Sequence, residues 1–139
     1  TYAEEMTNQT FAVTIHDFGG TTVTASTNFF SVADAELSAG PLTPPVILEG
    51  QPFTNSTVFK FTDANPGATA ADFYAVITLG DGNSVTLTST PSINGRIEAN
   101  ATGGFDVKLS YMYSEEVDNQ TFAVVVHDRL QADPIPAAI

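Results

Sequence analysis

Two histidine–aspartate pairs are the residues of this chain whose types and spacing come closest to a catalytic arrangement. His16 is followed by Asp17, and His127 is followed by Asp128. A histidine oriented by a neighbouring carboxylate is a common general base. However, no motif places a serine nucleophile near either pair, and strand alternation puts both histidines on an outer face beside a turn. We therefore expect no catalytic residues and no enzymatic activity.

Acidic side chains at strand ends and turns are the second group with chemical potential. Asp63, Asp72 and Asp81 occupy such positions, and Ca²⁺ binds six to eight hard oxygen ligands of this kind. The spacing of a calcium loop such as D-x-D-x-D-G is absent, and Asp81 lies between two glycines, where an aspartate commonly forms a turn. These three aspartates are the candidates for a structural Ca²⁺, solvated acidic loops are the alternative, and no other cofactor is expected.

Four N-x-[ST] sequons provide a third type of candidate site. A sequon is the acceptor motif for an N-linked glycan, which needs an exposed position. All four fall at predicted turns or strand starts, where a bulky sugar can project into solvent. The candidate glycosylation sites are Asn8, Asn55, Asn100 and Asn119.

The elements that carry these residues include a duplicated segment. Residues 1–17 read TYAEEMTNQTFAVTIHD and residues 112–128 read MYSEEVDNQTFAVVVHD, with 11 of 17 positions identical at an offset of 111 residues. A period of this length fits one β-sandwich domain per repeat and is too long for a solenoid. The chain therefore contains the closing strand of one repeat, followed by a whole repeat that closes in the same way.

Alternating apolar and polar residues predict β-strands throughout the chain. Phe11, Val13 and Ile15 alternate with polar side chains, which is typical of a half-buried strand. Gly80-Asp81-Gly82-Asn83 predicts a hairpin turn, because Gly and Asn accept a positive φ. Short strands with no helical period predict an all-β sandwich. The predicted strands cover residues 10–16, 21–30, 46–48, 57–61, 73–79, 84–88, 105–113 and 121–127.

The tyrosines divide by the parity of the strands on which they lie. Tyr111 and Tyr113 share the parity of Phe105, so we expect them in the core with tethered hydroxyl groups rather than as a sugar-stacking platform. Tyr74 has the opposite parity to Phe73 and is the better candidate for an exposed contact.

Composition excludes several classes of partner. Four basic against 16 acidic residues give a net charge of −12, which disfavours nucleic acids and anionic membranes. The absence of cysteine excludes disulfides, thiolate metal sites and cysteine nucleophiles. No apolar stretch is long enough for a transmembrane helix. We therefore expect no nucleic acid partner and no membrane insertion.

A series of short motifs resembles a known family. The chain contains DANP at residues 63–66, DFYAVI at 72–77, GDG at 80–82 and YSEE at 113–116, and it closes with VVVHD. Their order and spacing are similar to those of the PKD-like, immunoglobulin-like tandem repeats of large bacterial cell-surface proteins, although Leu79 stands where the family usually has Trp before GDG. The resemblance implies an immunoglobulin-like β-sandwich outside the cell that acts as a spacer, stalk or adhesive array, without catalysis.

Three segments follow from these patterns. Residues 31–130 are the expected immunoglobulin-like domain, and residues 131–139, which contain Pro134 and Pro136, are the expected C-terminal linker. Residues 1–30 are an extra strand segment. Either they end a preceding repeat in a longer tandem array, or they are donated to a neighbouring subunit. Their apolar residues need a partner surface in both cases, because exposed edge strands of this type associate.

The expected function is therefore structural. We expect a subunit of an extracellular filament, stalk or surface array, assembled head to tail through β-strand contacts at Phe11, Val13 and Ile15. Its partner would be a second copy or an adjacent repeat, and glycans are a further candidate partner. The alternative is an adhesin or a carbohydrate-binding module of a larger surface protein.

Overall fold

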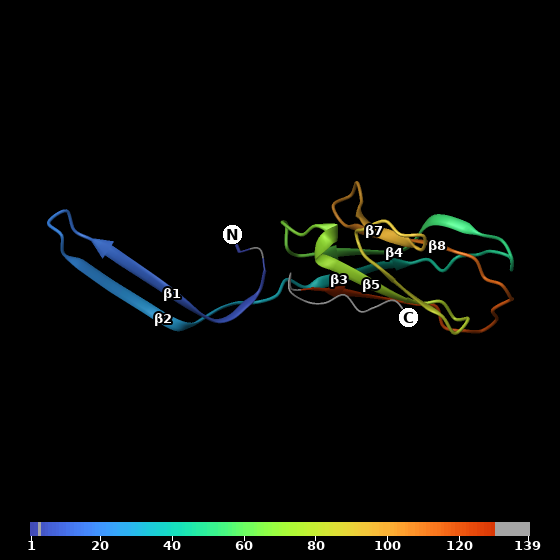
Figure 1. Ribbon diagram of the computed structural model, residues 1–139, viewed down its shortest axis with the longest axis horizontal. Coiled ribbons are helices and arrows are strands. Elements are labelled where there is room, and N and C mark those ends of the chain that lie inside the picture. Colours follow the sequence, from blue (N-terminus) through green and yellow to red (C-terminus); the bar gives the residue numbers. More distant parts are fainter. Residues whose placement is uncertain (3, 130–139) are drawn as a thin grey trace. The chain divides into compact units, whose positions relative to one another are not determined.

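The described part of the chain folds into antiparallel β-sheets and contains no α-helix (Figure 1). The computed structural model describes residues 1, 2 and 4–129, so the predicted linker at residues 131–139 lies outside the described residues. The described part has no helix with the length and apolar character required to cross a bilayer. The chain divides into two compact units, Thr1–Glu36 and Leu37–Ile139.

The first unit is a two-stranded hairpin. Strand β1 (Met6–His16) pairs antiparallel with β2 (Thr22–Val32), in a register that joins Val13 to Ala25 and Ile15 to Val23. The turn closes with a 2.8 Å hydrogen bond from the Asp17 amide to the Thr21 carbonyl. The predicted alternation of residues 10–16 and the following extended segment are both present. Strand β1 begins before its predicted start, and β2 continues past its predicted end.

The second unit contains two sheets. One has the order β3 (Leu37–Leu42), β4 (Phe53–Asp63), β8 (Phe105–Tyr111), β7 (Gly95–Ala99). The other has the order β6 (Ser84–Leu87), β5 (Phe73–Thr78), β9 (Ala123–Asp128), and the 3₁₀ turn η1 (Ala70–Asp72) precedes β5. This arrangement of antiparallel sheets is consistent with a β-sandwich.

Three phenylalanines join the two sheets at the centre of the core. The Phe61 ring of β4 lies 5.0 Å from the Phe73 ring of β5 and 5.2 Å from the Phe105 ring of β8, centroid to centroid. Phe73 meets both other rings edge-on, and the rings of Phe61 and Phe105 are stacked with an interplanar angle of 26°, two arrangements that aromatic pairs favour. Around them lie the buried residues of both sheets and of the segments that directly follow β5 and β8. They are Val58, Ala75, Ile77, Leu79, Val85, Leu87, Ile97, Val107, Leu109 and Tyr113. Val58 is buried although its parity is opposite to that of Phe61, because the register of β4 shifts between Thr57 and Phe59.

The GDG motif forms the predicted hairpin turn between β5 and β6. Gly80 and Gly82 both have positive φ, 86° and 89°, and the Leu79 amide donates to the Asn83 carbonyl across the turn. A residue with a Cβ would be strained at either glycine. The motif therefore has a conformational role in this chain.

The predicted edge strand at residues 46–48 is wrong. Residues 43–48 have no regular structure, and Val46 is fully exposed. Pro44 and Pro45 lack the N–H groups that a ladder requires. The edge strand is instead β3, which pairs with β4 despite containing Gly40 and Pro41. Proline is tolerated there because β3 lies at the edge and its register shifts between Ala39 and Leu42.

Candidate functional site

One face of the hairpin is apolar and half exposed. Phe11, Val13 and Ile15 of β1 are 47%, 47% and 62% exposed, and Val23 of β2 is 64% exposed on the same side. At the open end of the hairpin, the ring of Phe30 contacts Phe11 at 5.4 Å and also Tyr2. Six large apolar side chains thus share this surface, which we call the hairpin apolar face (Tyr2, Phe11, Val13, Ile15, Val23 and Phe30).

The other face of the hairpin is polar and internally hydrogen-bonded. The Thr10 hydroxyl donates to Asn28 at 3.0 Å, the hydroxyls of Thr14 and Thr24 share a 3.1 Å hydrogen bond, and Nδ1 of His16 lies 3.0 Å from the Thr22 hydroxyl. His16 is exposed, as its parity predicts. These bonds join the two strands in register on their polar face.

The repeat copy of β1 has a different environment. Phe122, Val124 and Val126, the counterparts of Phe11, Val13 and Ile15, are partly buried and pack against the core of the second unit. On the outer side of the same strand, the exposed His127 stacks on Tyr74 at 4.6 Å with an interplanar angle of 12°. The two copies of this strand sequence therefore differ in environment: β9 packs on the core of the second unit, and the apolar face of β1 is uncovered.

Three of the four sequon asparagines share an unusual backbone conformation. Asn8, Asn55 and Asn119 have φ values of 52°, 51° and 52°, and they are the only non-glycine residues with positive φ in the described part of the chain. Asn is among the residues that tolerate the left-handed region. Asn8 and Asn55 each lie at a strand irregularity, where the backbone amide donates to Ser31 Oγ and Ser110 Oγ, respectively. All three side chains are exposed, which is the position that a glycan needs.

Asn100 differs from the other three because its side chain builds the turn between β7 and β8. Its Oδ1 accepts hydrogen bonds from Thr102 and from the Gly104 amide, and its Nδ2 donates to Asp106 at 3.0 Å. Asp106 is 8% exposed and also faces Lys60 at 3.6 Å. A glycan on Asn100 would compete with this network for the same nitrogen.

The three candidate calcium ligands act in separate local turns. Asp63 accepts from the Asn65 amide, and Asp72 accepts from the amide and hydroxyl of Thr69. Asp81 accepts from Asn83 and Tyr111. No cluster of three or more metal-ligating side chains occurs among residues 1–2 and 4–129. The structure thus does not bring these aspartates together.

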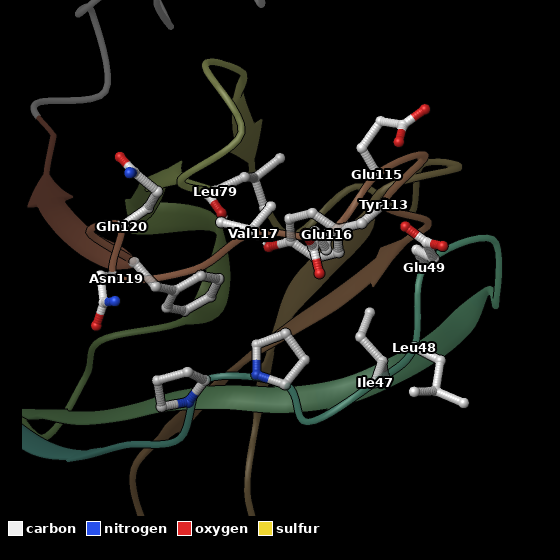
Figure 2. A pocket seen from close by; sticks show the side chains of 13 residues that line it. Ile47, Leu48, Glu49, Leu79, Tyr113, Glu115, Glu116, Val117, Asn119 and Gln120 are labelled. Carbon is white, nitrogen blue, oxygen red and sulfur yellow. Dashed lines mark hydrogen bonds between the residues drawn. The ribbon is translucent and has the colours of Figure 1, made fainter.

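The second unit has a groove of about 440 Å³ that the sequence did not indicate (Figure 2). Ile47 and Leu48 lie across from Tyr113 and Glu116 in this groove. The loop from Tyr113 to Gln120 is the copy of residues 2–9, which gave no signal for a pocket. The lining of the groove combines apolar groups with carboxylates. The further lining residues are Pro44, Pro45, Glu49, Leu79, Glu115, Val117, Asn119, Gln120 and Phe122.

Two tyrosines beside this groove have tethered hydroxyls, as predicted. Tyr113 is buried in the core and lines the groove, whereas Tyr111 is only partly buried and lines a neighbouring hollow. The Tyr113 hydroxyl donates to the Leu79 carbonyl at 2.9 Å, and the Tyr111 hydroxyl donates to Asp81 at 2.8 Å. Burial, reinforced by the charges of Asp81 and Tyr111, raises the pKa of Tyr113 to about 12. Burial and the hydrogen bond to Asp81 also raise the pKa of Tyr111. Both hydroxyls therefore remain protonated donors at neutral pH.

Comparisons of the chain with protein-family models, with curated proteins and with solved structures found no match.

Proposed function

We propose that this chain is a structural subunit of an extracellular filament, stalk or surface array, assembled head to tail through β-strand contacts. The observation that carries the proposal is the contrast between two copies of one strand. The apolar face of β9 packs against a core, whereas the equivalent face of β1 is 47–62% exposed at Phe11, Val13 and Ile15. The apolar face of β1 would therefore fit a surface like the core of the second unit, against which β9 packs.

The contact would join two unlike surfaces, which supports a filament rather than a closed dimer. The uncovered face belongs to the first unit, and the type of surface that fits it belongs to the second unit. A contact between unlike surfaces is heterologous, and it propagates when it does not close. Donated strands are a common form of such contacts, because main-chain ladders supply affinity and alternate side chains supply specificity. The partner is a second copy or an adjacent repeat of the same kind.

The extracellular setting and the immunoglobulin-like, PKD-like identity of the second unit belong to the same proposal. They rest on the motif series at residues 63–128. They also agree with a cysteine-free, acidic chain with four sequons. In a glycosylating host, the exposed Asn8, Asn55 and Asn119 are the expected sugar carriers.

Sedimentation velocity and electron microscopy of the concentrated chain test this proposal. The test variant replaces Phe11, Val13 and Ile15 by Thr, which keeps β-propensity and removes the apolar face. The matched control changes Ala12 and His16, on the opposite face of β1, to Thr. We expect continuous fibres and fast-sedimenting species from the unchanged chain and the control, and monomers from the test variant. Monomers from the unchanged chain at every concentration would contradict the proposal.

The groove in Figure 2 favours one alternative function, a binding module of an adhesin or of a larger carbohydrate-active protein. Its carboxylates at Glu49, Glu115 and Glu116 and its apolar floor suit a ligand that offers both hydroxyl and apolar surfaces. A ligand that binds only the folded state raises the melting temperature. A thermal-shift screen against a glycan library, with Glu116→Gln as the comparison, distinguishes this role from self-assembly.

A further inference from the structure

Strand β9 has one open edge, and hydrogen-bond parity identifies which of its residues face that edge. In antiparallel pairs, alternate residues direct both backbone groups to the same neighbour. The Arg129 amide donates to the Asp72 carbonyl at 3.0 Å, just before β5, so residues 127, 125 and 123 face β5. Val124 and Val126 therefore direct their N–H and C=O groups away from β5. No strand pairs with that side within the described residues.

The corresponding edge of β1 is occupied. The Asp17 amide donates to the Thr21 carbonyl, so Ile15 and Val13 direct their backbone groups to β2. At the repeat offset of 111 residues, Ile15 and Val13 correspond to Val126 and Val124. The edge that β1 offers to β2 is thus the edge that β9 leaves open.

From this correspondence we infer that the open edge of β9 binds a strand with the sequence of β2, supplied by a second copy of this chain. This inference rests on the proposed head-to-tail function, and it specifies the donor strand, the acceptor edge and their register. The donated strand runs antiparallel to β9, with Val23 opposite Val126, Ala25 opposite Val124 and Thr24 opposite Val125.

Side chains on both faces fit this register. Val23 and Ala25 take the same side as Val124 and Val126, so they extend the apolar layer that covers the core. On the outer side, Thr121 and His127 are identical to Thr10 and His16, which hydrogen-bond to Asn28 and Thr22 of β2. His127 of β9 and Thr121, two residues before β9, therefore offer the same side chains as two of the three β1 residues whose side-chain hydrogen bonds reach β2.

A second copy is a suitable source of the donated strand, because β2 would exchange its hydrogen-bond ladder with β1 for an equivalent ladder with β9 of the other copy. An isolated two-stranded hairpin is only marginally stable in water, and exchange of an identical element between protomers has a low free-energy cost. In the hairpin, Val23 of β2 is 64% exposed. Beside Val126 it would join a sheet that is already packed on a core, so burial favours the transfer of β2 to β9.

Engineered cysteines in the full chain test the register, since the native sequence has none. Chains with Thr24→Cys or Ser26→Cys are mixed with mass-tagged chains with Val125→Cys or Ala123→Cys, oxidised with glutathione disulfide, and analysed by mass spectrometry. The pairs Thr24 with Val125 and Ser26 with Ala123 are in register. The pairs Thr24 with Ala123 and Ser26 with Val125 are two residues out of register on the same face, and they serve as controls.

We expect the in-register pairs to form at least about tenfold more mixed disulfide than the controls, because disulfides need Cα atoms within about 7 Å. Equal yields, or a preference for the controls, would overturn the inference. If circular dichroism shows that the Ala123→Cys variant is unfolded, the test uses the Val125→Cys chain alone. The yield of its disulfide with Thr24→Cys is then compared with the yield with Ser26→Cys. Parallel sedimentation separates the two claims. Fibres without register preference leave the proposed function standing, and register preference without species larger than dimers supports this pairing alone.

Discussion

The hydroxyl of Tyr111 donates a 2.8 Å hydrogen bond to Oδ2 of Asp81 and thereby joins the two sheets of the second unit. Tyr111 ends β8 in one sheet, and Asp81 lies in the turn between β5 and β6 of the other. Asn83 bonds both partners, through its Nδ2 to Asp81 at 3.1 Å and to the Tyr111 oxygen at 3.2 Å. The GDG turn therefore also anchors one sheet to the other.

Replacing Tyr111 by Phe should lower the free energy of unfolding at pH 7 by about 1 kcal/mol, since one hydrogen bond is lost at a solvent-accessible site. Partial burial opposes ionisation of Asp81, but hydrogen bonds from Asn83 and Tyr111 outweigh it and lower its pKa. The contribution of Asp81 is therefore present at neutral pH and disappears as the pH falls through its lowered folded-state pKa. Urea unfolding should show the difference between the two proteins shrinking at strongly acidic pH, and a constant difference would argue against this role.

Tyr113 should make the protein sensitive to alkali. Burial raises its pKa to about 12, compared with about 10 in an unfolded chain. The unfolded state then loses its proton first, so this contribution is complete below about pH 10 and declines toward pH 12. Tyr113→Phe should be less stable at pH 7 by about 1 kcal/mol through the lost bond to Leu79. Chemical denaturation from pH 7 to 12 should show the difference in free energy of unfolding between the two proteins becoming smaller, because the wild-type protein loses stability as the pH rises.

Asn55 provides a test that separates backbone conformation from glycosylation. Its φ of 51° costs an alanine about 1–2 kcal/mol and a glycine almost nothing. Asn55→Ala should therefore lower the free energy of unfolding by about 1 kcal/mol, and Asn55→Gly should leave it nearly unchanged. Both variants abolish the sequon, so a glycan cannot explain the difference. Equal losses in protein from a non-glycosylating host would refute the conformational role.

Asn100 should not tolerate an isosteric charge. Asn100→Asp replaces the Nδ2 donor, 3.0 Å from Asp106, by an oxygen that faces a carboxylate. A lost bond to a charged partner costs about 1.5–3 kcal/mol, and repulsion adds to it. Denaturant titration should give a loss of at least about 2 kcal/mol at pH 7. The same change at the exposed Asn28 is the comparison and should cost little, because a carboxylate there would still accept the hydrogen bond from Thr10.

Strands with clear alternation could be predicted from the sequence, and irregular segments could not. Residues such as Val107 and Leu109 carry the period of two, and the glycines at 80 and 82 mark the hairpin turn. Strand β3 was missed because Gly40 and Pro41 oppose strand formation locally. Gly40 is needed there because a Cβ would lie 2.8 Å from the Lys60 carbonyl. Only the tertiary pairing with β4 reveals that requirement.

The candidate site was predictable where the repeat carries the information. The exposed apolar face of β1 follows from its alternation and from its copy at residues 121–127. The shared backbone conformation of Asn8 and Asn55 does not follow from the sequence. Only Asn8 has a repeat partner, and asparagine alone does not identify the conformation, because five of the eight asparagines do not have a positive φ. The groove between residues 44–49 and 113–122 likewise depends on two loops brought together by the fold.

The ends of the second unit have a topological consequence. Leu37 pairs with Asp63 beside Phe61, Phe61 packs on Phe73, and Phe73 pairs with Asp128. The polypeptide therefore enters at Leu37 and leaves β9 at the same pole of the unit, as the ribbon in Figure 1 also shows. One further antiparallel strand along β9 would shift the exit to the opposite pole. The presence or absence of such a strand therefore decides whether the chain enters and leaves this unit at one pole or at opposite poles.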